Sequence, residues 1–500
     1  MNSVTIVGGG LAGLAAAVRL TEAGWSVRLL EARRTLGGRA GTFVDSTDGP
    51  ALDHCQHVAL GCCTRFLALC RQVDALDLFT KHSRIHFLDA NGRQFDLAPT
   101  PWLPPPLHFG PALANLGFLR WPHRMRLALC LRRLARLAID PQHEPTAANW
   151  LSEQGQPREV VERFWSPVLV SALSETLDRI GLAAAQKVVV DSFYASTTGH
   201  ELYVPRRPLS EVYDRVVEWL ARRGARVDCE SPVREVLCDT NSGGRPSWIV
   251  RWSQRGESRG TRETRDSAGA RETRGTSESG EPGEARAVSE ARSDAVVVAV
   301  PWYRVRDLLS AELRADLPRL DDLQQLEPGA ITSVHLWFDR PITELPHAVL
   351  LDRLSQWLFR RPDGDVPSDS TAVTTGTAPR ACYHQVVISA AHLLATAPRE
   401  ELVDTVVAEL RSTFPAARDA KLVRSRVLNE PRAVFSPLPG HQAFRPAQCT
   451  SRAGLALAGD WTATGWPATM EGAVRSGELA AEAIIASRMK ASPITSADCE

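Results

Sequence analysis

The sequence predicts a two-domain α/β fold, and three stretches carry this prediction. Residues 4–31 contain a β-branched strand, a glycine turn, an Ala-rich helix and a second strand, which together form a β-α-β unit. Residues 293–301 include an unbroken apolar run that is typical of a buried strand. Residues 455–486 read as a strand, a glycine-rich turn and a long helix. We therefore expect a discontinuous Rossmann-like domain and a second, mixed α+β domain built from the intervening pieces.

The two expected domains alternate along the chain. Nucleotide-binding parts are expected at 1–80, 196–310 and 446–490, and parts of the substrate domain at 81–195, expected to be helical, and 311–445. Residues 253–293 contain no aromatic side chain and one valine, with arginines balanced by acids. Such a segment cannot bury enough surface to offset its conformational entropy, so we expect a disordered insertion that extends a hairpin loop. A basic anchor is the alternative, which the interspersed acids disfavour.

The overall composition indicates a globular protein without a strong electrostatic field. The chain has 500 residues, of which 44% are hydrophobic, and a formal net charge of zero, so it can bury a large core and we expect no nucleic acid partner. Its ten cysteines form no C-x-x-C pair, which favours a reducing, cytoplasmic compartment. We expect no cleaved signal peptide and no spanning helix, so that any membrane contact is peripheral, at the inner membrane.

Gly8, Gly10 and Gly13 form a G-x-G-x-x-G motif directly after the first strand and at the start of the first helix. The first glycine allows a tight turn, the second lets a pyrophosphate approach the backbone, and the third lets the helix and the strand pack closely. Glu31 ends the second strand, where an acid accepts hydrogen bonds from ribose hydroxyls. Strand, helix and acid together predict dinucleotide binding at the helix N-terminus.

The residues after Glu31 distinguish FAD from NAD. Gly37, Gly38 and Arg39 resemble the second glycine motif of the FAD-dependent amine oxidases and carotenoid desaturases. Residues 455–477 resemble the closing flavin motif of the same superfamily, in which Asp460 would hold the ribityl or pyrophosphate region. The helix that starts near Thr469 would point its positive end at the flavin pyrimidine carbonyl. This resemblance implies an FAD-dependent oxidoreductase and adds the cofactor-binding residues Gly37, Gly38, Arg39, Val233, Gly459, Asp460, Thr469 and Met470.

A narrower resemblance is to the hydroxysqualene dehydroxylases, also called squalene-associated FAD-dependent desaturases. It rests on Gln56-His57, on Trp165-Ser166-Pro167 and on Trp461 to Gly477, and it covers most of the chain apart from the insertion. The sequence departs from that family at His54 and Cys55, where Asn and Gly are usual. Glycine allows backbone conformations that cysteine resists, so this departure calls into question how the loop fits against the flavin.

The narrower resemblance implies a reductive dehydroxylation in squalene and hopanoid biosynthesis. Reduced FAD, supplied with electrons by an external donor, would deliver hydride to the carbon of hydroxysqualene that loses its hydroxyl. Hydroxide is a poor leaving group, so a general acid is required, and a C30 isoprenoid needs a long, apolar pocket. Gln56 and His57 are the expected catalytic residues, with His57 as the acid or an orienting group. The alternative is that His57 only bonds a backbone carbonyl or a flavin oxygen.

Three other functions stay open at this point. A carotenoid or related polyene desaturase would share the fold, the cofactor and the apolar tunnel, but would move hydride from substrate to oxidised flavin. An amine oxidase usually carries a lysine on the strand that follows residues 299–301, and residues 330–338 contain none. A non-catalytic flavin-fold protein is the third possibility, in which His54 and Cys55 would mark lost activity.

Two further stretches have two interpretations each. Two histidines and four cysteines fall between residues 54 and 70, but His54, Cys55 and His57 are packed too tightly for a regular tetrahedron, so we expect no metal. Residues 102–139 combine Trp102 and Trp121 with an arginine-rich helix. They form either an interfacial patch that extracts lipid substrate from a membrane or an ordinary helix with a solvated arginine face.

Overall fold

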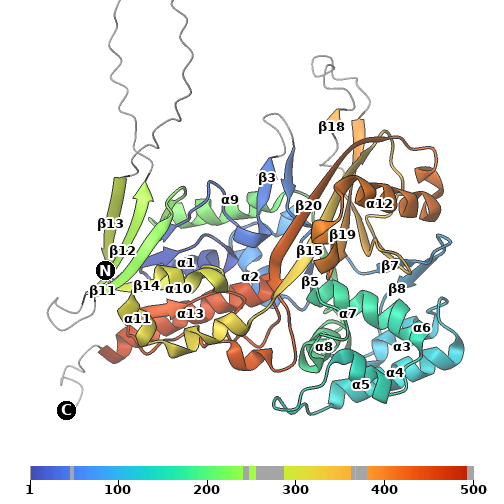
Figure 1. Cartoon of the computed structure of the whole chain (residues 1–500), viewed down its shortest axis with the longest axis horizontal. Helices are drawn as coiled ribbons and strands as arrows, with labels where there is room; N and C mark the ends of the chain where they lie inside the picture. The colour runs from blue at the N-terminus through green and yellow to red at the C-terminus, as the bar shows by residue number, and fades with distance from the viewer. Residues whose placement is uncertain are drawn as a thin grey trace, which may run out of the picture.

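The computed structural model describes residues 2–44, 50–239, 247–254, 287–361, 366–367 and 380–491. The chain folds into two lobes (Figure 1). One lobe contains both the first strand and the last helix, and the other contains a large sheet with helices on either side of it. Two long strands, β15 (Pro328–Phe338) and β20 (Leu422–Phe435), run from one lobe into the other.

The first lobe is built on a five-stranded parallel sheet with the order β10-β2-β1-β14-β21. Its strands are β1 (Ser3–Val7), β2 (Ser26–Leu30), β10 (Arg226–Asp228), β14 (Ala295–Val298) and β21 (Leu455–Leu457). Strands from the start, the middle and the end of the chain thus share one sheet. This confirms the predicted α/β class with a discontinuous Rossmann-like domain.

The helices of this lobe pack closely on the parallel sheet. Helices α1 (Leu11–Glu22) and α13 (Met470–Ala491) lie side by side (Figure 1). A Cβ at Gly477 would lie 2.1 Å from the Ala12 carbonyl oxygen, so only glycine permits this approach. Helix α2 (Thr64–Gln72) packs on α13, and α9 (Leu209–Ala221) packs on α1. Their apolar faces and the sheet form one core.

An antiparallel sheet covers the other face of the parallel sheet. It contains β11 (Val233–Asp239), β12 (Ser247–Gln254) and β13 (Ala287–Ser293) in that order. Residues 253–254 and 287–293 are therefore paired strand residues, which corrects both ends of the predicted disordered insertion. Strand β12, expected as one arm of a hairpin, pairs with β13, and its alternating residues pack into a core. Residues 255–286 lie outside the described residues. The short helices α10 (Val305–Leu308) and α11 (Ala311–Ala315) follow β14.

The second lobe contains a large sheet with the order β20-β15-β19-β17-β16-β7-β8, and β18 also pairs with β19. Besides β15 and β20, its strands are β7 (Ile85–Leu88), β8 (Gln94–Leu97), β16 (His347–Leu350), β17 (Trp357–Arg360), β18 (Val366–Pro367) and β19 (Arg380–Ser389). Helix α12 (Arg399–Thr413) packs on one face of this sheet. The other face meets a group of helices.

Those helices come from residues 110–194. They are α3 (Gly110–Ala114), α4 (Trp121–Arg136), α5 (Ala147–Glu153), α6 (Arg158–Val160), α7 (Ser166–Leu173) and α8 (Leu182–Val189). A π-helical turn, η5 (Val190–Tyr194), continues α8. The arginine-rich helix that the sequence predicts is confirmed as α4. Among the described residues, no helix is both long enough and apolar enough to cross a bilayer.

The expectation that residues 81–195 are helical is wrong for the first part of that range. Strands β7 and β8 form a hairpin there, and Gly92 in its turn has a φ of +77°. The Asn91-Gly92 pair between two alternating stretches is a hairpin pattern, so the helical interpretation overlooked turn chemistry. Two smaller sheets, β3 (Thr42–Val44) with β4 (Ala51–Asp53) and β5 (Ala59–Leu60) with β9 (Leu202–Pro205) and β6 (Phe79–His82), connect the lobes.

Candidate active site

The glycine motif forms an open cradle between β1 and α1. A Cβ at Gly13 would lie 2.0 Å from the Gly8 carbonyl oxygen, and one at Gly8, whose φ is +111°, would lie 2.4 Å from the Ala299 carbonyl oxygen. These two glycines therefore permit close backbone packing. A Cβ at Gly10 would meet nothing within 4 Å. Gly10 thus faces open space at the N-terminus of α1, where a pyrophosphate can approach the backbone.

The second glycine motif lies directly against this cradle. The Gly37 amide donates to the Gly9 carbonyl at 2.9 Å, and Gly37 has a φ of +101°. Any side chain at Gly37 would collide with the Tyr213 ring on α9, whose hydroxyl donates to the Ala40 carbonyl at 2.6 Å. Glu31 is buried beside both motifs and accepts hydrogen bonds from the Gly9 and Arg33 amides at 2.6 and 2.8 Å. The two motifs and the acid therefore form one wall.

The closing motif completes this wall from the other end of the chain. The Asp460 carboxylate pairs with the Arg39 guanidinium, and the Gly459 amide donates to the Ser476 hydroxyl at 2.8 Å. Arg445, which the sequence did not single out, holds the loop from behind by donating to the carbonyls of Asp460 and Thr462 at 2.8 and 2.5 Å. Burial lowers the pKa of Arg445 to about 10, well above neutral pH.

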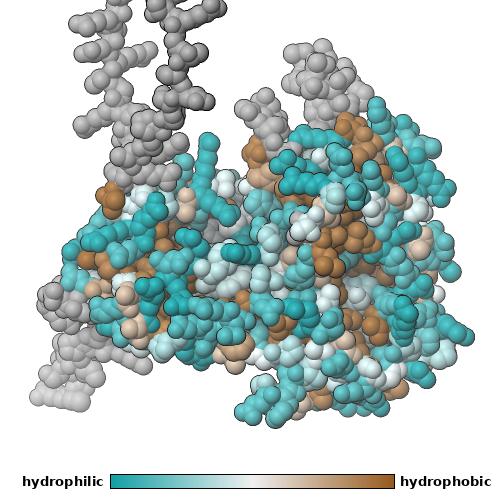
Figure 2. Space-filling model, viewed as in Figure 1, coloured by the Kyte–Doolittle hydropathy of each residue, from teal (hydrophilic) through white to brown (hydrophobic). Residues whose placement is uncertain are grey.

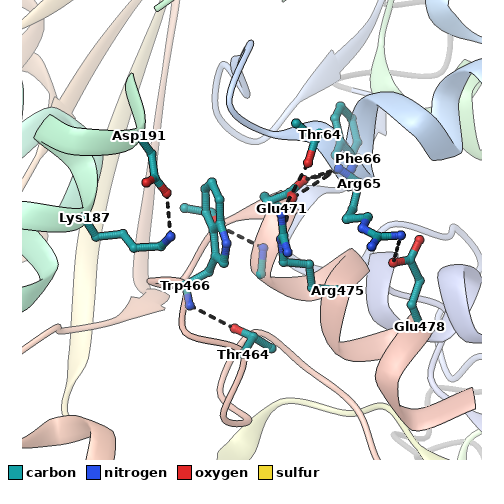
Figure 3. Close-up of polar contacts among 12 residues, drawn as sticks. Thr64, Arg65, Phe66, Lys187, Asp191, Thr464, Trp466, Glu471, Arg475 and Glu478 are labelled. Atoms are coloured by element: carbon teal, nitrogen blue, oxygen red, sulfur yellow. Dashed lines mark hydrogen bonds and ion pairs between the residues drawn. The ribbon is translucent and has the colours of Figure 1, made fainter. Parts of the chain in front are cut away.

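The last helix begins where the resemblance placed it. Helix α13 starts at Met470, and the Thr469 hydroxyl accepts from the Gly472 amide at 3.1 Å. The next residue, Glu471, is fully buried and accepts from the Arg65 and Phe66 amides at the start of α2 (Figure 3). Arg475 donates to it at 2.6 Å. Glu471 therefore caps α2 and holds it against α13, a role that sequence spacing does not reveal.

One large cavity connects these motifs with the second lobe. Its volume is about 720 Å³. All but one of the predicted cofactor and catalytic residues line it, namely Gly8, Gly10, Glu31, Gly37, Gly38, Arg39, Gln56, His57, Val233, Gly459, Asp460, Thr469 and Met470. Gly13 is the exception, because it packs the helix against the strand instead. The far end of the cavity is apolar and is lined by Ile85, Phe87, Val168, Ala172, Val349, Trp357, Phe359 and Val387.

The loop that carries Gln56 and His57 is anchored by a buried carboxylate. Asp53 accepts from the Thr42 hydroxyl at 2.6 Å and from the Leu209 amide, at the start of α9, at 2.9 Å. Its second oxygen lies 3.4 Å from Arg361, and both side chains are buried. A charge buried this deeply needs such partners. Asp53 therefore fixes the loop, and the next residues reach the cavity.

His57 and Gln56 present different chemistry to the cavity. His57 Nδ1 lies 2.8 Å from the Cys55 carbonyl oxygen, which can only accept, so Nδ1 carries the proton. Burial lowers the pKa of His57 below its ordinary value, with Asp53 opposing the shift. At neutral pH the ring is therefore neutral and its Nε2 is an acceptor. Gln56 is buried, and within the described structure its Nε2 has no hydrogen-bond partner.

The departure at His54 and Cys55 does not strain the loop. Cys55 does not have a positive φ, so its backbone conformation suits an L residue. Burial raises the pKa of the Cys55 thiol to about 12, which keeps it protonated. His54 lines the cavity beside Phe43, with ring centroids 5.5 Å apart. Within the described residues, no three His, Cys, Asp or Glu side chains are grouped to hold a metal ion.

A charged pair that the sequence did not indicate also lines the cavity. Lys187 on α8 donates to Asp191 on η5 at 2.5 Å, and its Nζ lies 4.5 Å from the centroid of the Trp466 ring. Figure 3 shows Lys187 and Asp191 approaching Trp466 from the helices of the second lobe. Arg475 contacts the same ring at 5.1 Å. Residues of α8 and α13 thus meet at one indole near the start of α13.

The chain's own groups fit a flavin dinucleotide. Gly10 leaves room for a pyrophosphate, Glu31 is placed to accept from ribose hydroxyls, and the N-terminus of α13 supplies a partial positive charge. The orphaned amide of Gln56 supplies a donor for an oxygen inside the cavity. When bound, FAD would supply hydride exchange with a substrate carbon.

Comparisons with known proteins agree with this fit. The model of the family described as flavin containing amine oxidoreductase matches residues 11–485. The 15-cis-phytoene desaturase of Synechococcus elongatus is 25% identical over 495 residues, covering 97% of this chain and 96% of the relative. The zeta-carotene desaturase of Arabidopsis thaliana is 24% identical over 516 residues, covering 96% and 85%.

Solved structures of two amine oxidases have the same fold. Cyclohexylamine oxidase from Brevibacterium oxydans superposes with a TM-score of 0.64 at 18% identity, covering 98% of this chain and 100% of that one. Putrescine oxidase with bound putrescine gives 0.64 at 17% identity, covering 97% and 99%. The family match spans most of the chain. This protein is an FAD-dependent oxidoreductase that belongs to the flavin-containing amine oxidoreductase family.

Proposed function

We propose that this protein transfers hydride between FAD and a long isoprenoid, and that its reaction is the reductive dehydroxylation of hydroxysqualene to squalene. One observation carries the proposal: the cradle for the dinucleotide and the apolar compartment are parts of a single cavity. An apolar compartment takes a hydrocarbon chain because burying that chain removes apolar surface from water. The curated relatives named for phytoene and zeta-carotene support an isoprenoid substrate.

The strand β15 supports a hydrocarbon over an amine. Amine oxidases usually carry a lysine on this strand, and here Ile331 and Ser333 are its cavity-lining residues. No lysine occurs between residues 328 and 338. Trp357 and Phe359 stack at 5.4 Å and extend the apolar wall. Burying a charged amine against this apolar wall would carry a desolvation cost that a hydrocarbon does not have.

The polar groups at the cavity wall support a substrate with a hydroxyl. Gln56 offers an unpartnered N–H donor, and neutral His57 offers an acceptor nitrogen. A hydroxyl can donate to one and accept from the other, which orients the C–O bond. A pure polyene has no oxygen to use these two groups, so their presence supports dehydroxylation within the isoprenoid class.

A second candidate is the desaturation of a carotenoid or related polyene. The names of the curated relatives favour it over dehydroxylation. The two reactions move hydride in opposite directions, and the apolar walls serve both. The test is to incubate the purified protein in two arms, hydroxysqualene with FAD and a reductant, and phytoene with FAD and a quinone oxidant, and to identify the products. Squalene in the first arm supports dehydroxylation, and a new conjugated double bond in the second supports desaturation.

We also propose that the second lobe collects its substrate from an anionic membrane surface. Trp121, Met125 and Leu129 are spaced at i, i+4 and i+8 on α4, and 60%, 48% and 54% of their surfaces are exposed. Figure 2 shows hydrophobic residues along the edge of the molecule where Figure 1 places α4 and α5. Between residues 97 and 139 the chain has six arginines and no acid. We call Trp121, Met125 and Leu129 the α4 patch.

The helix that carries the α4 patch is tied at its C-terminal end to a helix that lines the cavity. Gln186 on α8 donates to the carbonyls of Leu134 and Leu137, both at 2.7 Å, which ties the end of α4 to α8. The neighbouring Lys187 and Val188 line the cavity. Helix α8 therefore lies between the C-terminal end of α4 and the substrate compartment. Arginines around exposed aromatic and aliphatic side chains are typical of binding at a lipid interface.

A further inference from the structure

The pair formed by Lys187 and Asp191 is unusual for its position. Lys187 is the one lysine among the described residues that line the cavity, whose wall also includes Val188, Phe193 and Ala172. The other cavity-lining cations, such as Arg39, belong to the dinucleotide end. The two side chains are 32% and 25% exposed, so the pair is partly withdrawn from water and carries part of the desolvation cost that a fully exposed ion pair avoids. A ligand that uses the pair would explain its location.

Two contacts hold the Lys187 ammonium in place. Asp191 lies one helical turn away and accepts from Nζ at 2.5 Å. The Trp466 ring, at the other side, attracts the cation through its face at 4.5 Å. A lysine side chain is long and flexible, so these two contacts restrict it to one place in the wall. An ammonium group has three N–H donors and Asp191 takes one, which leaves donors for an oxygen of a bound molecule.

The position of Trp466 sets the pair at the junction of the two compartments. Trp466 lies four residues before Met470, the start of α13, where the flavin pyrimidine ring is expected. Figure 3 shows the indole between Lys187 on one side and Arg475 and Glu471 on the other. The ammonium is therefore near the dinucleotide end of the apolar compartment, where a reacting carbon would have to meet the cofactor.

We propose that Lys187, held by Asp191, donates the proton that allows the substrate hydroxyl to leave as water. This proposal rests on the proposed dehydroxylation. The C–O bond breaks as its oxygen takes the Nζ proton, and the carbon receives a hydride, two electrons and one proton, from reduced FAD, which becomes oxidised. Lys187 regains a proton from solvent. A donor of the reduced nicotinamide or ferredoxin class returns two electrons to FAD.

Lys187 is better placed for this step than His57. His57 is neutral at neutral pH and its Nδ1 proton is bonded to the Cys55 carbonyl, so it has no proton directed at the substrate. The Asp191 carboxylate holds the Lys187 ammonium in the cavity wall at 2.5 Å, while His57 and Gln56 orient the hydroxyl. Asp191 acts through Lys187 and is a positioning residue.

The test compares Lys187→Met with Lys81→Met in the full-length protein loaded with FAD. Lys81 is the matched control, because it also pairs with an acid, Glu201 at 3.1 Å, but does not line the cavity. Lys187→Met is expected to keep bound FAD and to form squalene at least about a hundredfold more slowly, the usual range for loss of a general acid. Lys81→Met is expected to match the wild type. Unchanged squalene formation by Lys187→Met would overturn the proposal.

A binding measurement separates this role from a structural one. Binding of a C30 alcohol and of squalene is followed through the absorbance of bound FAD, which does not require turnover. The wild type is expected to bind the alcohol more tightly, and Lys187→Met to lose most of that preference. Equal preference in both proteins, with a lower melting temperature in the variant, would mean that Lys187 only joins the lobes and would overturn the proposal.

A second variant covers the case in which Lys187→Met does not fold. Asp191→Asn keeps the lysine and the shape of the pair, and it is expected to slow squalene formation about tenfold while FAD stays bound. A rate equal to that of the wild type would contradict the role of Asp191. If the FAD-loaded wild type forms no squalene at all, the proposed dehydroxylation fails, whereas squalene from the wild type and from Lys187→Met at equal rates rejects only the proton donor.

Discussion

Arg39 and Asp460 lie 421 positions apart in the chain and form an ion pair in the wall of the cavity. Arg39 also donates to the Ala433 carbonyl at 3.2 Å and stacks over the Trp302 ring at 5.4 Å. The Asp460 side chain is almost fully buried. The pair therefore joins the second glycine motif, the closing motif and strand β20 in the cavity wall where we propose that the cofactor binds.

Replacing Arg39 with Met is expected to weaken FAD binding at least about tenfold, because it leaves the buried Asp460 carboxylate unpaired beside the phosphates. The measurement is titration of the apoprotein with FAD, followed by flavin fluorescence. Arg28→Met is the control, since Arg28 pairs with Asp228 at 2.7 Å outside the cavity. Equal affinity in the two variants would contradict the role assigned to Arg39.

Replacing Gly10 with alanine is expected to affect FAD binding, and replacing Gly13 with alanine is expected to affect the stability of the fold. At Gly10 a Cβ meets no protein atom within 4 Å, so the apoprotein should melt like the wild type but lose FAD affinity. At Gly13 a Cβ would lie 2.0 Å from a carbonyl oxygen, so unfolding should become easier by about 1–3 kcal/mol. Thermal unfolding and FAD titration of the Gly10→Ala and Gly13→Ala variants check these two expectations. A stable Gly13→Ala beside an unstable Gly10→Ala would reverse this assignment.

His57→Ala is expected to retain FAD and lose most turnover, because the acceptor Nε2 that orients the hydroxyl disappears. Burial lowers the pKa of His57 below 6.5. We therefore expect titration of His57 to cause no loss of wild-type turnover as the pH rises through 6.5. The pH profile of squalene formation measures this. His143→Ala, at a side chain that is 81% exposed, is the control. Full activity in His57→Ala would remove the histidine from the mechanism.

Replacing Trp121, Met125 and Leu129 together with serine is expected to abolish binding of the protein to anionic vesicles. Flotation with phosphatidylglycerol-containing liposomes measures binding, which should also weaken as salt is raised, because the arginines contribute. Leu393→Ser is the matched control, since that leucine is 90% exposed and lies outside the α4 patch. Wild-type protein that stays in the soluble fraction would contradict the membrane proposal.

As the pH is lowered, the fold is expected to lose stability at pH values well above those at which carboxylates titrate. Burial lowers the pKa of His335 and His347 to about 3 and that of His384 and His441 to about 4, from 6.5. Between these values only the unfolded chain binds the proton, so each histidine reduces stability by up to about 1.4 kcal/mol per pH unit as pH falls below 6.5.

The check is the melting temperature measured between about pH 7 and about pH 5. His347→Asn should flatten this dependence, because it removes one of the groups that only the unfolded chain protonates. His143→Asn, at the exposed side chain, should leave the dependence unchanged. A melting temperature that stays constant over this range would contradict the expected linkage.

The cofactor motifs were predictable because they are local. A strand, a glycine turn and a helix start occupy fewer than about a dozen residues, and the spacing of the glycines within them is visible in the sequence. The contact between Gly10 and Gly37 was not predicted, because it joins two motifs through the tertiary fold. The hairpin of β7 and β8 was equally local, and its Asn91-Gly92 turn could have been recognised.

Strand β20 and the Lys187 pair were harder to predict. Pro431 interrupts a charged stretch and argues against a strand, yet β20 lies at the edge of its sheet, where the register against β15 shifts and proline is tolerated. Lys187 and Asp191 show only an i, i+4 ion pair in the sequence. Their importance comes from Trp466, which reaches them through the tertiary fold, and no local pattern contains that contact.

The central claim is that the cradle and the apolar compartment serve one hydride transfer. The most direct test is an anaerobic single turnover, in which the FAD-loaded protein is reduced chemically, freed of excess reductant and mixed with hydroxysqualene. We predict that the bound flavin is reoxidised while squalene appears in equal amount. Flavin that stays reduced, or that is reoxidised without squalene, would contradict the account.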